Sequence, residues 1–117
     1  MNEKAAAVAE RAAQIMATRG KTEGSFVSKD GVCVRGALAL AEAEIEDEDR
    51  WDWYLRYEGD SSTAVCSRTI RAILSIGREE DVSVVKWNDL GFDGTPPSGE
   101  DAQLLLKKAA ERLREQT

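Results

Sequence analysis

The stretch WNDLGFDGTPPSGEDAQLLLKKAAERL, residues 87–113, decides most of the predicted fold. Its second half has apolar residues at the spacing i, i+3, i+4, i+7 and i+11, which is typical of one face of an α-helix: Ala102, Leu105, Leu106, Ala109 and Leu113. Ser98, with an acid at position 101, resembles a capping box. Acids then open the segment and bases close it, as the helix dipole favours. The sequence therefore predicts a C-terminal helix that begins near Ser98.

Three more helices are expected upstream, at residues 2–19, 35–46 and 62–77. The first is rich in alanine, which allows close packing against a neighbour, and Gly20 is a plausible left-handed stop. The second has a broad apolar stripe that ends at Ile45. Glycine costs helix stability, so Gly36 near its start indicates a close contact between backbones.

Short β-like segments lie between these helices. Residues 25–28 and 32–34 favour a hairpin through Lys29-Asp30-Gly31, although the second could also be the entry to the next helix. Residues 81–86 are rich in β-branched side chains and predict another short strand, which leaves Trp87-Asn88-Asp89 in the following loop. The expected fold is mainly α: about four helices around one small core with a hairpin or strand pieces, with α+β left open.

Composition bounds the class of protein. A chain of 117 residues is expected to form a single domain, residues 1–117. It has 22 acids against 16 bases, a net charge of −6, which opposes binding to nucleic acid or anionic lipid. No apolar run is long enough to span a bilayer, and charges at Glu3, Lys4, Glu10 and Arg11 interrupt any signal-peptide core. We therefore expect a cytoplasmic protein, in the host cytoplasm if a phage encodes it.

The chain contains no histidine, which removes Ser-His-Asp and Cys-His nucleophiles and histidine-ligated zinc. Its two cysteines, Cys33 and Cys66, are too few for a structural zinc site and lack the CxxC spacing of a redox pair. We expect both to be buried free thiols. No metal, no cofactor and no enzymatic activity are expected.

Residues 42–57 combine acids with aromatic side chains. Seven of the eleven residues from 42 to 52 are acidic, and four of the chain's seven aromatic residues follow at 51–57: Trp51, Trp53, Tyr54 and Tyr57. Aromatic residues are enriched among interface hot spots, and a charged rim gives partner selectivity. One interpretation is a protein-binding surface with Glu46, Glu48 and Asp49 as its rim. The alternative is that Trp51 or Tyr54 packs into the core and the acids form a solvated face.

Trp87-Asn88-Asp89 also has two interpretations. Asn88 and Asp89 could form a polar site for a ligand or a metal. The favoured interpretation is structural: their side chains bind nearby backbone N–H groups and hold the loop, while Trp87 fills the core beside the last helix.

Two motifs together resemble a known group of sequences. The first is Cys33-x-x-Gly36-Ala37-Leu38 after a turn at Gly31, and the second is Trp87-Asn88-Asp89 before the C-terminal helix. In order and spacing the chain resembles an uncharacterised family of small proteins from actinobacteria and their bacteriophages. The resemblance implies a cytosolic accessory protein of phage type and supplies no reaction or ligand. The acidic and aromatic residues at 42–57 depart from the family's pattern.

The sequence thus predicts a small acidic protein that binds an unidentified host or phage protein and modulates a host process, as a monomer or homodimer. Direct contact with nucleic acid or membrane is not expected. Three alternatives remain open: a DNA mimic that inhibits a host DNA-binding protein, a small enzyme using paired carboxylates, and self-association through the alanine-rich first helix.

Overall fold

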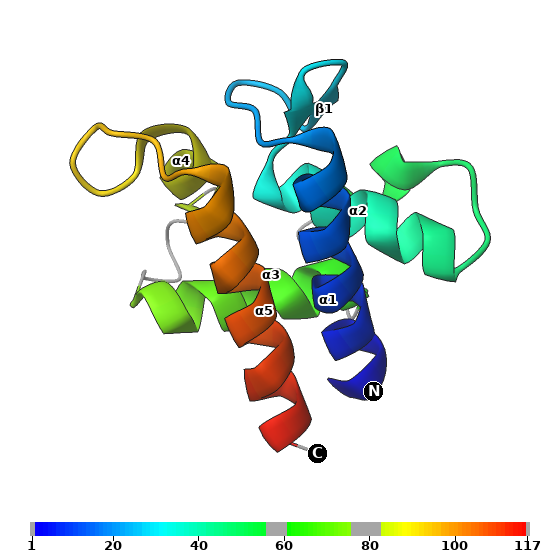
Figure 1. Ribbon diagram of the computed structural model, residues 1–117. Helices are drawn as coiled ribbons and strands as arrows, with labels where there is room; N and C mark the ends of the chain where they lie inside the picture. The colour runs from blue at the N-terminus through cyan, green and yellow to red at the C-terminus, as the bar shows by residue number, and fades with distance from the viewer. Residues whose placement is uncertain (1, 56–60, 76–82, 117) are drawn as a thin grey trace.

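The computed structural model describes residues 2–55, 61–75 and 83–116. In this part of the chain, five α-helices, one 3₁₀ helix and a two-stranded antiparallel sheet follow one another (Figure 1). Their bounds are α1 Asn2–Arg19, β1 Val27–Ser28, β2 Gly31–Val32, α2 Val34–Ile45, the 3₁₀ helix η1 Trp51–Leu55, α3 Ser62–Leu74, α4 Ser83–Leu90 and α5 Gly99–Glu115. The mainly α fold with a small hairpin is confirmed, and the four predicted helices are present within three residues of their expected ends.

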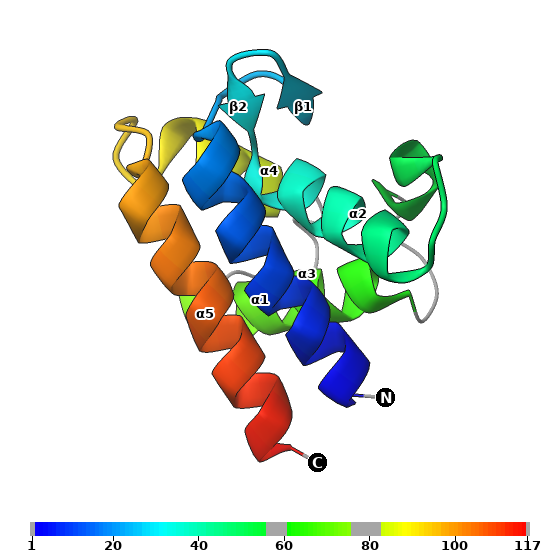
Figure 2. The same cartoon turned by 45° about the vertical axis from the view of Figure 1, so that its right-hand side comes forward.

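The helices α1 and α5 form the centre of the molecule. They lie side by side and antiparallel, so that both chain ends are at the same end of the pair, while α3 crosses behind them and α2 flanks α1 (Figure 2). Small side chains make the close approach of α1 possible, and these are at most 2% exposed: Ala5, Ala6, Ala9, Ala12 and Ala13. The alanine-rich face of α1 is therefore covered within the chain, so those alanines are not available as a seam for self-association.

The hairpin is confirmed and packs against the start of α2. Val27 pairs with Val32 and Ser28 with Gly31, and Lys21 adds a parallel bridge to Val32. Gly36 sits directly against this region, because a Cβ built on it would lie 1.8 Å from the carbonyl oxygen of Phe26. The close backbone contact predicted at Gly36 is therefore present, and only glycine fits there.

Two local predictions were wrong. Residues 83–86 belong to helix α4, which continues to Leu90, so Trp87-Asn88-Asp89 lies on a helix rather than in a loop. Burial explains the difference, since Val84, Trp87 and Asn88 are buried at the spacing i, i+3, i+4, and this overrides the β propensity of the valines. Ile45 is 43% exposed at the last position of α2, so the buried stripe of that helix ends before it.

No helix in the described part of the chain is both long and apolar enough to cross a membrane.

Candidate functional site: a cleft beside an acidic and aromatic segment

The end of α2 directs the chain toward its aromatic residues. Asp47 adopts a left-handed conformation, with φ at +57°, and donates its N–H to the carbonyl of Glu44 at 3.2 Å. The N–H of Glu48 reaches back to the carbonyl of Ala43 at 2.8 Å. These two bonds form a Schellman motif with aspartate where glycine is usual. The motif ends α2 sharply, and the chain then runs outward to η1.

We call residues 46–55 the acidic–aromatic segment. Trp53 is 51% exposed, and the guanidinium carbon of Arg50 lies 5.1 Å from the centre of its ring, within cation–π range. Trp51 and Tyr54 are half-buried at the base of the segment. Burial raises the pKa of Tyr54, and the carboxylates of Glu42 and Glu48 raise it further. Trp53 is thus a surface residue, and neither Trp51 nor Tyr54 belongs to the fully buried core. Tyr57 lies outside the described residues.

The acids of the segment differ in their surroundings. Glu46, Glu48 and Asp49 are exposed. Glu46 forms an ion pair with Lys4 across to α1. Asp52 pairs with Arg50 at 3.3 Å, and hydrogen bonding to this guanidinium lowers the pKa of the Asp52 carboxyl. In the described part of the chain, no cation forms an ion pair with Glu48 or Asp49.

Glu42 is the exception to the solvated acidic face that one interpretation of the sequence expected. It is only 2% exposed and accepts bonds from the Ser62 N–H at 3.1 Å, the Thr63 N–H at 2.7 Å and the Thr63 hydroxyl at 2.7 Å. The Ser61 hydroxyl accepts from the Ala64 N–H at 3.2 Å. The first three N–H groups of α3 are therefore all satisfied, and a negative charge lies at the positive end of the helix.

Arg35, also on α2, contacts the end of η1, as Glu42 contacts the start of α3. It is 1% exposed, and its guanidinium donates to the carbonyl of Leu55, the last residue of η1. A cation therefore lies at the carbonyl end of η1, while Glu42 lies at the amide end of α3. Through these two buried charges, α2 fixes both ends of the connection from η1 to α3. The acidic–aromatic segment is consequently attached to the core at a defined place.

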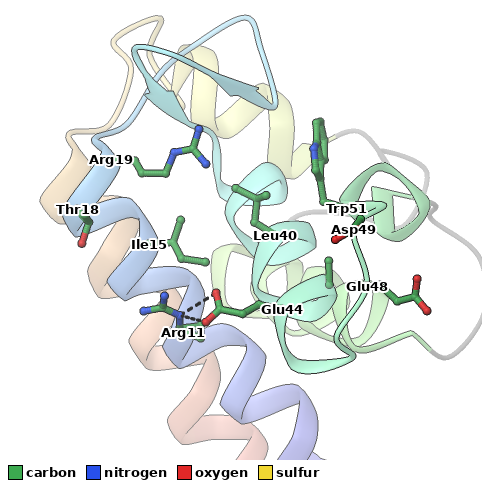
Figure 3. Close-up of a pocket in the computed structure, with 10 residues that line it drawn as sticks. Arg11, Ile15, Thr18, Arg19, Leu40, Glu44, Glu48, Asp49 and Trp51 are labelled. Carbon is green, nitrogen blue, oxygen red and sulfur yellow. Dashed lines mark hydrogen bonds and ion pairs between the residues drawn. The ribbon is translucent and has the colours of Figure 1, made fainter.

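A cleft of about 450 Å³ lies between α1, α2 and the acidic–aromatic segment (Figure 3). Its apolar surface comes from Ile15, Leu40 and Ala43. Arg11 and Glu44 form an ion pair at 3.1 Å along one edge. Arg19 stands on the α1 side, with Trp51 and Asp49 on the other side of Leu40 (Figure 3). The cleft thus combines an apolar floor with charges of both signs. Thr18 and Glu48 complete its lining.

The Trp87-Asn88-Asp89 motif joins three distant parts of the chain. Asn88 is fully buried; its side-chain oxygen accepts from the Val34 N–H at 3.1 Å and its amide donates to the Thr22 carbonyl at 2.9 Å. Lys21 donates to the Asn88 carbonyl at 2.7 Å. The side chain of Asp89 accepts from the Gly24 N–H at 3.2 Å. Both motif side chains bind backbone groups, but these lie 54 to 66 residues away rather than nearby. Trp87 is buried in the core.

Both cysteine thiols are buried, which lowers their reactivity. Cys33 is buried at the start of α2, where its sulfur accepts from the Gly36 N–H at 3.3 Å, and burial raises its pKa. Cys66 donates to the Ala5 carbonyl at 3.1 Å, and burial raises its pKa to about 12. Neither thiol therefore has the thiolate character of a nucleophile at neutral pH. Among the described residues, no group of three or more acids and cysteines is placed to hold a metal ion.

Sequence reasoning missed the roles of Arg11, Arg19, Arg35 and Glu42. For Glu42 a signal existed, because Leu38, Ala41 and Glu42 follow the spacing i, i+3, i+4 and so share the buried face of α2. The same signal existed for Arg35, which precedes Leu38 and Ala39 at the spacing i, i+3, i+4 on that buried face. For Arg11 and Arg19 no local pattern separates a cleft-lining side chain from an exposed one.

These features define a small, acidic, mainly helical protein with an aromatic segment at the edge of an open cleft. The chain belongs to the family of unknown function DUF6197, whose model matches residues 1–112. The resemblance to an uncharacterised family is confirmed at this level, while the family's actinobacterial and phage origin stays a prediction. No curated protein and no solved structure matches the chain.

Proposed function

We propose that this chain is a protein-binding module whose contact surface is the acidic–aromatic segment. The observation that carries the proposal is Trp53, half exposed on a helix that the buried charges of α2 hold at a fixed place. Tryptophan, tyrosine and arginine are the residue types enriched among interface hot spots, and Trp53 lies beside Arg50 on this exposed surface. The exposed carboxylates of Glu46, Glu48 and Asp49 supply a polar rim, which favours a partner with basic residues.

The proposal takes the partner to be a host or phage protein in the cytoplasm of an actinobacterium, and the effect to be modulation of a host process. This follows the resemblance of the two motifs to small proteins of actinobacteria and their phages. The net charge of −6 supports contact with protein rather than with nucleic acid or an anionic membrane. The proposal holds for a monomer or a homodimer, since the acidic–aromatic segment does not need a second copy.

Binding rather than catalysis is proposed for two reasons. Both thiols are buried with raised pKa values, and the buried carboxylate of Glu42 is fully occupied by three hydrogen bonds.

The distribution of acids also disfavours a DNA mimic, which needs charge spread over a long surface. In the acidic run Glu42 is buried, and Glu44, Glu46 and Asp52 are each paired with a base.

The test is affinity capture of the tagged protein from an actinobacterial lysate, comparing wild type with Trp53→Ala and with Phe92→Ala. Phe92 is a matched control, because it is an aromatic residue 72% exposed on the loop between α4 and α5, away from the acidic–aromatic segment (Figure 1). We expect one dominant protein that Trp53→Ala loses and Phe92→Ala retains. Circular dichroism checks that both variants fold. Equal capture by all three forms, or loss of folding in Trp53→Ala, would contradict the proposal.

A further inference from the structure

One side of the cleft described above is formed by the acidic–aromatic segment itself, through Glu48, Asp49 and Trp51. Leu40 is half-buried at its centre, between α1 and Trp51 (Figure 3). A volume of about 450 Å³ is in the range of ligand pockets, so the cleft has room for one or two side chains but not for a whole helix. An apolar side chain placed on Leu40 would remove the exposed part of Leu40 from water, while Ile15, which is 7% exposed, adds little to the surface that is covered.

The charges around the cleft are not all neutralised. Arg11 is paired with Glu44, which closes one edge. Arg19 instead donates to the Ser28 carbonyl at 3.4 Å, and none of the described carboxylates forms an ion pair with it. Asp49, across the cleft, likewise has no described cation as a partner. A cation and an anion therefore face the same open space from opposite sides, with an apolar surface between them.

Each of these charges specifies a complementary group. A carboxylate beside Arg19 can accept two parallel N–H bonds from the guanidinium. A guanidinium or ammonium beside Asp49 also lies next to the ring of Trp51, where a cation–π contact adds to the charge pairing. A partner of uniform charge would gain at one side of the cleft and lose at the other.

From this arrangement we propose that the cleft binds a short segment of the partner protein carrying an apolar residue between an acidic and a basic one. The acidic residue faces Arg19, the apolar residue rests on Leu40, and the basic residue faces Asp49. This inference rests on the proposed function, and it deepens it by stating the chemistry and polarity of the partner's segment. It also gives Trp51, at the base of the acidic–aromatic segment, a part in recognition alongside Trp53.

A random 12-residue peptide library displayed on phage, panned against the folded wild-type protein, tests the inference. We expect enriched peptides in which an acid and a base flank an apolar residue. Synthetic copies are then titrated by fluorescence anisotropy against Arg19→Glu and Asp49→Lys. Each reversal should weaken binding about tenfold or more, since like charges then face each other. The double reversal should prefer the peptide whose acid and base are exchanged. Arg112→Glu, an exposed reversal on α5, is the matched control and should change binding by less than about twofold.

Other results would overturn the inference and separate it from the proposed function. If Trp53→Ala weakens the peptides while both cleft reversals leave them unchanged, the segment binds partners but the cleft does not. If Arg112→Glu weakens binding as much as the cleft reversals, the effect is net charge rather than position. Peptides enriched without the pattern of opposite charges, or no enrichment at all, would likewise exclude a bipolar segment as the occupant. The lysate capture with Trp53→Ala judges the proposed function independently.

Discussion

The structure predicts that the buried carboxylate of Glu42 contributes strongly to stability. In Glu42→Ala, three donors lose their acceptor: the N–H groups of Ser62 and Thr63 and the hydroxyl of Thr63. A hydrogen bond to a charged group contributes about 1.5–3 kcal/mol, but these three share one carboxylate whose own desolvation offsets part of the gain. Leaving a buried donor without an acceptor costs about 1–3 kcal/mol, so for these three donors we expect a loss of about 3–5 kcal/mol in the free energy of unfolding.

Urea denaturation followed by tryptophan fluorescence measures this loss. With an m-value of about 2 kcal/mol/M, the midpoint should fall by about 2 M at an unchanged slope. Glu44→Ala is the matched control, because Glu44 lies two residues along the same helix and forms an exposed ion pair with Arg11. Such a pair contributes about 0–1 kcal/mol.

The conservative variant Glu42→Gln keeps one oxygen as acceptor but turns an N–H group toward a backbone N–H donor. The free energy of unfolding of Glu42→Gln should therefore lie between the values of the wild type and Glu42→Ala. If Glu42→Ala costs no more than Glu44→Ala, then Glu42 does not cap α3, and the account of how α2 fixes the acidic–aromatic segment fails.

Three further predictions concern other parts of the fold. Gly36→Ala should lower the free energy of unfolding by at least about 2 kcal/mol, because its Cβ would lie 1.8 Å from the Phe26 carbonyl oxygen. Gly99→Ala is the control: its Cβ would lie 3.6 Å from the nearest atom, so it should be tolerated in the same urea assay. Asn88→Ala should lower the free energy of unfolding by about 2–4 kcal/mol, seen as a lower Tm, because it leaves the Val34 N–H and the Thr22 carbonyl unpaired. A change below about 1 kcal/mol would refute the structural role of Asn88. Burial raises the pKa of Cys66 from 9.0 to about 12, so between these values only the unfolded chain ionises and stability falls as pH rises. Cys66→Ala should remove up to about 1.4 kcal/mol per pH unit from that alkaline decline, measured by urea denaturation between pH 9 and 11. An unchanged slope would contradict the burial of the thiol.

The helical core was predictable because its signal is local. In α5 the apolar residues repeat at helical spacing, and the Ser98 hydroxyl accepts from the Asp101 N–H at 3.1 Å, as the capping pattern predicts. Gly20 ends α1 with φ at +86°, and Ser61 caps α3. In each case the residues that decide the structure lie within one or two turns of one another.

Prediction failed where distant contacts decide the structure. The valines at 84 and 85 favour a strand locally, but burial of Val84, Trp87 and Asn88 against the rest of the chain makes the segment helical. The partners of Asn88 lie 54 and 66 residues away, so nothing near it in sequence reveals them.

The candidate site shows the same limit. The aromatic residues and their acidic rim were visible as composition. The cleft was not, because Arg19 and Leu40 come together only when α1 packs against α2.

The central claim, that the acidic–aromatic segment contacts a partner protein, is tested most directly by site-specific photo-crosslinking. The residue at position 53, and separately the residue at position 92, is replaced by p-benzoylphenylalanine, and each protein is irradiated in an actinobacterial lysate. Both positions are exposed aromatics, so the probe should perturb the fold little. We expect one dominant crosslinked protein from position 53, and we expect that this protein is not crosslinked from position 92. Crosslinking of the same partner from position 92 with none from position 53 would contradict the central claim.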